Sequence, residues 1–243
     1  VKAKGTTIIT NAAREPEITD LADFLNSCGA KVSGAGEGTI IIEGVDKLHG
    51  CTHSIIPDRI VAATLMSAIA CTSSSAILDS VIMSHLSTVT PVFEQTGCDL
   101  SYKDGKLRVS APYRLRSPKL IRTMPYPGFP TDAQAPVMAM TCKANGLTVF
   151  VENIFESRYK HVDELNRLGA NIKVEGKVAV VDGVRTLSGA SVRALDLRGA
   201  ASLVVAGLSA QGHTEVSGIN FLERGYDELE VVLQSLGADV KKI

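Results

Sequence analysis

Apolar runs long enough to form buried helices recur three times along the chain. The runs span residues 60–71, 133–142 and 199–209. An acidic residue able to cap a helix lies just before or at the start of each run: Asp58, Asp132 and Asp196. Because apolar residues cover most faces of these segments rather than one stripe, the pattern predicts three helices buried inside the protein. A short stretch rich in strand-forming residues follows each run.

Four further helical patterns end at a glycine. The glycines are Gly29, Gly97, Gly169 and Gly237, separated by 68, 72 and 68 residues. Glycine adopts the left-handed conformation that ends a helix without a clash of a Cβ atom, so we expect each of them to end a helix. After three of these glycines, two alternating strands flank an acidic residue and a second glycine, which predicts hairpins turning at 37–38, 104–105 and 175–176.

Together these patterns define a repeating unit of about 70 residues, which reads strand, buried helix, strand, amphipathic helix, strand, strand. Residues 51–243 hold three units, the last cut short in its final strand, and residues 1–50 hold only the rear part of a fourth. We therefore predict an α/β protein in which 51–243 form one three-repeat domain and 1–50 end a repeat of another domain. A repetitive α/β domain without symmetry is the alternative.

Composition argues against several classes of function. The net charge of −1 and pI near 6.6 disfavour a nucleic-acid or membrane-surface protein. No signal peptide is apparent, and the apolar runs are shorter than the ~18 residues of a membrane span. The five cysteines form no CxxC pair, which favours reduced thiols in the cytoplasm, and the five histidines show no ligand spacing. We expect surface or hydrogen-bonded histidines, no metal and no cofactor.

The segment Pro127–Gln134, with the sequence PGFPTDAQ, resembles the proline-rich loop of the UDP-N-acetylglucosamine 1-carboxyvinyltransferases, a family of enolpyruvyl transferases. Further segments match the family in its order along the whole chain: 11–18, 56–60, 155–158, 196–198 and 224–226. The resemblance implies an inside-out α/β prism built of three βαβαββ repeats, plus part of a second prism domain.

The resemblance also implies a reaction, in which an enolpyruvyl group passes from phosphoenolpyruvate to the 3-hydroxyl of UDP-N-acetylglucosamine during peptidoglycan synthesis. By this resemblance Asp132 receives or orients the proton of the sugar hydroxyl, and Arg224 meets phosphoenolpyruvate. Arg158 and Arg198 match arginines near the same cleft, and Ile154 matches a position that contacts the sugar nucleotide through its backbone.

Each of these residues also has a structural interpretation. Asp132 fits an N-cap, because aspartate commonly accepts a hydrogen bond from the first turn of a helix. Arg158 and Arg198 fit salt-bridge partners, and Arg224 fits an exposed residue at the start of a helix. The residues alone leave these alternatives open.

The chain lacks the family's lysine–asparagine pair and its loop with an acid cysteine. It also begins without methionine, as an internal fragment does, so we expect it to be inactive without a missing N-terminal part of the same protein. It departs from the family at Val61, Ala63 and Pro136, the last of which we expect in the first turn of its helix. Two alternatives remain open: a diverged, non-catalytic prism-fold binding module, and an enzyme like 5-enolpyruvylshikimate-3-phosphate synthase.

Overall fold

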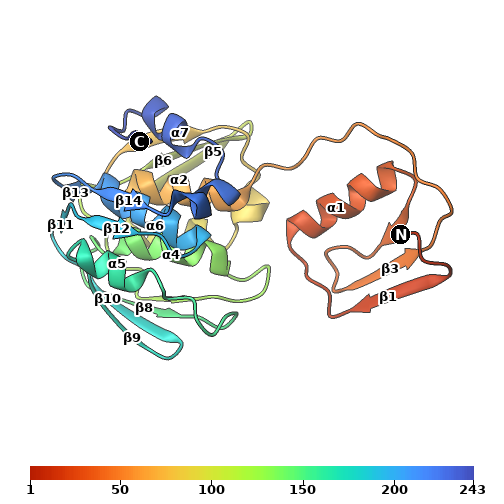
Figure 1. Ribbon diagram of the computed structural model, residues 1–243, viewed down its shortest axis with the longest axis horizontal. Coiled ribbons are helices and arrows are strands. Elements are labelled where there is room, and N and C mark those ends of the chain that lie inside the picture. Colours follow the sequence, from red (N-terminus) through yellow and green to blue (C-terminus); the bar gives the residue numbers. More distant parts are fainter. The chain divides into compact units, whose positions relative to one another are not determined.

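The computed structural model describes all residues from Val1 to Ile243. The chain divides into two compact units (Figure 1). The smaller unit comprises Val1–Pro57 with Pro125–Gly128, and the larger comprises Asp58–Met124 with Phe129–Ile243. None of the helices is both long and apolar enough to cross a membrane.

The smaller unit consists of one helix and one three-stranded antiparallel sheet. Its elements are β1 (Thr6–Thr10), α1 (Pro16–Ser27), β2 (Lys31–Ser33) and β3 (Thr39–Glu43). The strand order is β1-β3-β2, so the last strand lies in the centre, and Glu43 pairs with Thr6 on one side and Lys31 on the other. The pattern of strand, helix and two strands is the one that the sequence predicts for this region.

Three buried helices form the interior of the larger unit: α2 (Arg59–Cys71), α4 (Thr131–Thr141) and α6 (Leu197–Leu208). Each of the three packs against both of the others, and Figure 1 shows them at the centre with strands around them. Their interfaces contain small and flexible side chains such as Ala63, Met138 and Ala201, all without exposed surface. The prediction of three helices buried inside the protein is confirmed.

Strands cover these helices in separate sheets. The first sheet contains β4 (Ser75–Leu78), β5 (Asp99–Lys103) and β6 (Lys106–Ser110) in the order β4-β6-β5. The second contains β7 (Leu120–Arg122), β8 (Leu147–Val151), β9 (Asn171–Glu175) and β10 (Val178–Asp182) in the order β7-β8-β10-β9. Two parallel pairs follow: β11 (Leu187–Ser188) with β13 (Ala210–Gln211), and β12 (Ser191–Arg193) with β14 (Glu215–Ser217).

Short helices connect these strands: η1 (Met83–Leu86), α3 (Thr90–Thr96), α5 (Val162–Arg167), η2 (Ile219–Arg224) and α7 (Leu229–Ser235). All four glycines predicted to end helices lie at the ends of α1, α3, α5 and α7, with φ of +91°, +95°, +89° and +92°. The repeated sequence pattern therefore encodes a repeated backbone conformation. Asp104 and Gly105, both with positive φ, form the predicted turn between β5 and β6.

The starts of the three buried helices differ in one respect. Asp58 caps α2 by accepting from the amides of Ile60 at 2.7 Å and Val61 at 3.1 Å. Asp196 caps α6 through the amide of Gly199 at 2.7 Å. In α4 the N-cap is Pro130, which makes no side-chain cap, and Asp132 lies inside the first turn. The N-cap interpretation of Asp132 is therefore wrong, and its carboxylate is left for other partners.

The expectation that Pro136 lies in the first turn is also wrong. Because α4 begins at Thr131, Pro136 falls in the second turn, inside the helix. Proline has no amide hydrogen, so the carbonyl of Asp132, four residues earlier, lacks its usual helical partner. A proline inside a helix destabilises that helix by about 3 kcal/mol. The residues on either side of Pro136, Ala135 and Val137, are buried in the core.

Gly169 allows a clean test of the repeated helix end. A Cβ atom there would meet only the amide nitrogen of Ser188 at 3.9 Å, so Gly169→Ala changes the backbone energy and not the packing. We expect the free energy of unfolding to fall by about 1 kcal/mol, because alanine disfavours the left-handed conformation. Urea unfolding measures the change. Gly50→Ala is the control, because its φ is not positive and its Cβ would meet no atom within 4 Å; an equal loss in both variants would contradict the explanation.

Candidate active site

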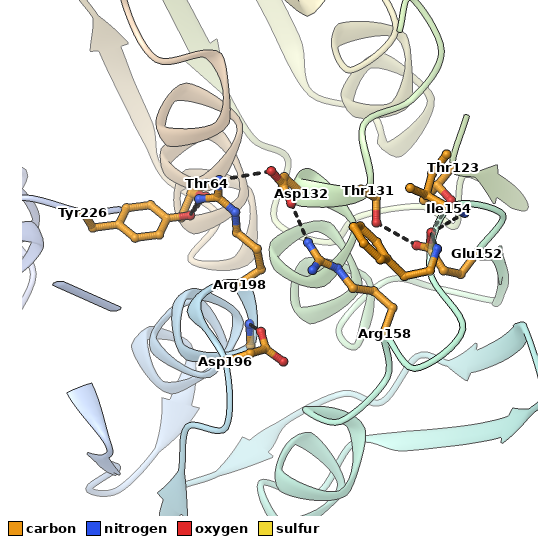
Figure 2. Close-up of polar contacts among 12 residues, drawn as sticks. Thr64, Thr123, Thr131, Asp132, Glu152, Ile154, Arg158, Asp196, Arg198 and Tyr226 are labelled. Carbon is orange, nitrogen blue, oxygen red and sulfur yellow. Dashed lines mark hydrogen bonds and ion pairs between the residues drawn. The ribbon is translucent and has the colours of Figure 1, made fainter. Parts of the chain in front are cut away.

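Asp132 joins two arginines that are distant from it in sequence (Figure 2). Its Oδ1 accepts from Nη2 of Arg158 at 2.5 Å, and its Oδ2 accepts from Nη2 of Arg198 at 3.2 Å. The Asp132 side chain is 42% exposed, whereas those of Arg158 and Arg198 are 19% and 13% exposed. The structure thus brings together three of the five predicted site residues, in a cluster with two guanidinium groups and one carboxylate that is open to solvent.

Arg198 is held in place by an aromatic ring as well as by Asp132. Its Nη1 donates to the hydroxyl of Tyr226 at 3.3 Å, and its Cζ lies 5.7 Å from the centroid of that ring. The Tyr226 hydroxyl also bonds Oγ1 of Thr64 in α2 at 2.8 Å. Burial lowers the pKa of Arg198, but Tyr226 and Asp132 outweigh this effect and the pKa is raised. Arg198 is therefore a fixed positive charge near neutral pH.

Arg158 packs against the residue three positions before it. Its Cζ lies 5.1 Å from the centroid of the Phe155 ring, an arrangement that favours a cation through the electron density of the ring face. The Nε atoms of both Arg158 and Arg198 are buried and make no hydrogen bond. Both guanidinium groups thus direct their Nη atoms toward Asp132 and hold the Nε atom away from water.

A buried carboxylate, Glu152, orders the loop that carries Arg158. Only 1% of Glu152 is exposed. Its Oε1 accepts from Oγ1 of Thr123 at 2.9 Å and from the amides of Ile154 and Phe155 at 2.8 and 3.1 Å. Its Oε2 accepts from Oγ1 of Thr131 at 3.0 Å. These four donors satisfy the buried charge without a cation and link the end of β7, the start of α4 and the loop.

Ile154 and Arg224 lie outside the cluster around Asp132. Ile154 is 38% exposed, and its amide is already used by Glu152. Arg224 is exposed at the end of η2, and its side chain makes no hydrogen bond or ion pair. Tyr226, which belongs to the same motif as Arg224, does reach the cluster, because its hydroxyl accepts a hydrogen bond from Arg198.

His161 differs from the expectation of a surface or hydrogen-bonded histidine, which is wrong for this residue. It is 3% exposed, and neither ring nitrogen has a hydrogen-bond partner. His161 lies against the start of α6, since a Cβ atom added at Gly199 would be 3.1 Å from the Cβ atom of His161. Burial lowers the pKa of His161 to about 4; the charge of Arg158 adds to this shift, and the charge of Asp196 opposes it. The imidazole is therefore neutral near pH 7.

Three residues of the site were missed from the sequence: Thr64, Glu152 and Tyr226. Thr64 lies within an apolar run, where a threonine reads as part of the core. Glu152 directly follows a strand, β8, at a common place for an exposed acid. Tyr226 lies in a matched motif, which was the one signal available. Within that motif the functional role was assigned to Arg224, two positions earlier.

The arrangement has two chemical capacities. Guanidinium groups bind carboxylates and phosphates through paired N–H donors, and two of them beside one carboxylate leave an excess of positive charge that favours an anionic ligand. The partly exposed carboxylate of Asp132 can accept a proton from a hydroxyl group held against it. Both capacities are present at one place, at the starts of α4 and α6.

Comparisons with known proteins identify the class. The family model described as EPSP synthase (3-phosphoshikimate 1-carboxyvinyltransferase) matches residues 1–233, and the chain belongs to this family. Two relatives carry the name UDP-N-acetylglucosamine 1-carboxyvinyltransferase. The protein of Geobacter metallireducens is 50% identical over 99% of this chain and 58% of its own length. The protein of Bacillus subtilis with the number 2 in its name is 48% identical over 99% of this chain and 56% of its own length. The chain spans less than two thirds of the length of these relatives.

Solved structures agree on the fold. The enolpyruvyl transferase NikO from Streptomyces tendae is 27% identical, with a TM-score of 0.87 over 98% of this chain and 57% of that protein. The EPSP synthase from Acinetobacter baumannii is 20% identical, with a TM-score of 0.71 over 99% and 59%, a likeness of fold alone. The mixed α/β fold of this chain is therefore that of the enolpyruvyl transferases and EPSP synthases.

Removal of Glu152 tests whether it orders the loop. We expect Glu152→Ala to lower the free energy of unfolding by about 1–3 kcal/mol, because four donors lose their acceptor in a buried place. Glu152→Gln is the matched control and should lose less, since its Oε1 keeps three donors and the Thr131 hydroxyl can reverse its role. Urea unfolding measures both variants. Equal losses for Ala and Gln would contradict this account of the site.

The buried histidine predicts a pH dependence of stability. The unfolded chain protonates His161 near its ordinary pKa of 6.5, whereas the folded protein resists protonation down to about 4. Stability is therefore lost as the pH falls from 6.5 to about 4, by on the order of 3 kcal/mol from this residue. Urea unfolding of His161→Leu should show a smaller decline across this window than the unaltered protein. His213→Gln, at an exposed position, is the control; the idea fails if both variants decline like the unaltered protein.

Proposed function

We propose that this chain forms part of a UDP-N-acetylglucosamine 1-carboxyvinyltransferase. The enzyme transfers an enolpyruvyl group from phosphoenolpyruvate to the 3-hydroxyl of UDP-N-acetylglucosamine, with release of phosphate, in the cytoplasmic stage of peptidoglycan synthesis. The observation that carries the proposal is the Asp132 carboxylate held between the guanidinium groups of Arg158 and Arg198. Relatives of that name, 46–50% identical over nearly the whole chain, support the choice of substrate.

Asp132 is the proposed proton acceptor for the sugar hydroxyl. Its carboxylate is the most exposed member of the cluster and makes no bond to a backbone amide, so lone pairs remain for a hydroxyl donor. Arg158 and Arg198 fix the orientation of the carboxylate and add positive charge near the reacting group, where negative charge develops as the hydroxyl loses its proton. Proton transfer to such a positioned group contributes about 10²–10⁴-fold to a rate.

The remaining two predicted residues have roles that depend on the substrates. We propose that Arg224, an exposed cation without a protein partner, binds phosphoenolpyruvate through its guanidinium fork. Ile154 contacts the sugar nucleotide. Because its amide already donates to Glu152, that contact falls to its carbonyl or to its partly exposed side chain.

The proposed architecture is an inside-out prism of three βαβαββ repeats over residues 51–243, with residues 1–50 ending a repeat of a second prism domain. The mutual packing of α2, α4 and α6 supports a threefold arrangement. The helices α3, α5 and α7 each end at a glycine in the left-handed conformation, which supports equivalent repeats. We propose that an N-terminal part of the same protein completes the enzyme by supplying the acid, and that the 243-residue chain does not turn over by itself.

Substitution of Asp132 tests the function. In the polypeptide that includes the N-terminal part, Asp132→Asn should lower kcat for phosphate release by at least about 10²-fold, because the amide cannot accept the hydroxyl proton. Phosphate release is measured with both substrates, and calorimetry follows the binding of UDP-N-acetylglucosamine. Asp163→Asn, at an exposed position in α5, is the matched control and should leave kcat unchanged.

Three outcomes would contradict parts of the proposal. Full activity of Asp132→Asn removes Asp132 as the proton acceptor. Phosphate release by the 243-residue chain alone removes the claim that it is incomplete. Binding of UDP-N-acetylglucosamine without any turnover in the longer polypeptide indicates the alternative, a non-catalytic binding module.

A further inference from the structure

Two cysteines far apart in sequence lie side by side in the smaller unit. Sγ of Cys28 is 3.3 Å from Sγ of Cys51, across 23 residues of chain. Cys28 follows the last residue of α1 and is buried, whereas Cys51 is exposed. The other three cysteines, Cys71, Cys98 and Cys142, are buried in the larger unit. This pair is the only place in the chain where two thiols are close together and one of them faces solvent.

Cys51 belongs to residues 44–57, called the connector here, which follow β3 and precede the cap of α2. Alternate residues of the connector contact the end and side of α1. The amide of His49 donates to the carbonyl of Cys28 at 2.9 Å, and Nε2 of His53 lies 3.0 Å from Oδ1 of Asp20. Cys51 lies between these two contacts along the chain. The connector is thus already aligned on α1 at the point where the sulfurs meet.

We propose that Cys28 and Cys51 form an oxidisable pair whose disulfide fastens the connector to α1. A disulfide requires the two sulfur atoms to approach to about 2.05 Å, a movement of roughly 1.3 Å that rotation about the side-chain bonds and a small backbone shift can supply. The contacts of His49 and His53 on either side hold the backbone near that position. The proposal concerns the redox state of this unit and does not depend on the transferase activity.

The reaction balances with a small disulfide as the oxidant. The exposed thiolate of Cys51 attacks a disulfide such as glutathione disulfide, forms a mixed disulfide and releases one small thiol. Sγ of Cys28 then loses its proton, attacks the Cys51 sulfur and releases the second small thiol. The protein loses two hydrogen atoms, and one small disulfide becomes two thiols. Because the attacking species is the thiolate of Cys28, the second step should become faster as the pH rises.

The fastened form has a defined physical consequence. The link closes a loop that contains β2 and β3, and only residues 52–57 remain between the crosslink and the cap of α2. The hydrogen bond from His49 to Cys28 then lies inside the closed loop, next to the link. Opening of the connector at His49 therefore requires distortion of a covalent ring, and the exchange of this amide with solvent should become slower.

Trypsin makes the link directly identifiable. Cleavage at arginine and lysine places Cys28 in the peptide 15–31 and Cys51 in the peptide 48–59, and neither peptide contains another cysteine. After treatment of the folded chain with glutathione disulfide, mass spectrometry without reduction should find these two peptides joined. Cys51→Ser should abolish the link completely, Cys28→Ser should leave a lasting glutathione adduct on Cys51, and Cys98→Ser, the control, should still form the link.

Two results would overturn the proposal. One is the absence of the joined peptides in the unaltered chain at a large excess of glutathione disulfide, whether Cys51 keeps a lasting glutathione adduct or does not react at all. The other is formation of the link with no slowing of hydrogen exchange at His49, which would show that the disulfide does not fasten the connector. Reduction with dithiothreitol should restore both the separate peptides and the faster exchange.

Discussion

The ion pairs of Asp132 depend on how the three buried helices meet. Asp132 is the second residue of α4, and Arg198 is the second residue of α6. Because α4 and α6 pack directly on each other, equal positions in their first turns come within reach, and the carboxylate meets the guanidinium group. Tyr226 then reaches Arg198 and Thr64 in α2, so that residues from all three central helices join one network.

The starts of the three helices show why only one acid is free for chemistry. Asp58 and Asp196 precede their helices and spend their carboxylates on backbone amides. In α4 the proline at the N-cap shifts the acid into the helix, where no amide of the first turn faces it. A carboxylate that caps a helix has lone pairs already occupied by backbone amides, and it lies where those amides hold it rather than facing a substrate. Each repeat thus provides an aspartate near the start of its buried helix. Two of these aspartates cap their helices, and the position of Asp132 inside α4 leaves its carboxylate to other partners.

The sequence was sufficient to predict the elements whose cause is local. Glycine ends, the turn at Asp104, and buried helices follow from residues within a few positions of each other. Asp132, Arg158 and Arg198 emerged from matched motifs, but their mutual contacts did not. The bond between Thr64 and Tyr226 joins residues 162 positions apart, and no local pattern encodes it. Pro136 was misplaced because the start of α4 is set by Pro130 and not by the acid that usually marks a helix start.

Adjacent residues at the start of α4 separate two carboxylates by environment. The hydroxyl of Thr131 donates to Glu152, whose four donors are neutral and whose surroundings exclude water. The next residue, Asp132, has two cationic partners and reaches solvent. Glu152 is buried among four fixed donors and out of reach of a substrate, whereas Asp132, held by one hydrogen bond from each of two arginines, keeps both its orientation and its access to solvent. Glu152 therefore positions the loop of Arg158, and the chemistry falls to Asp132.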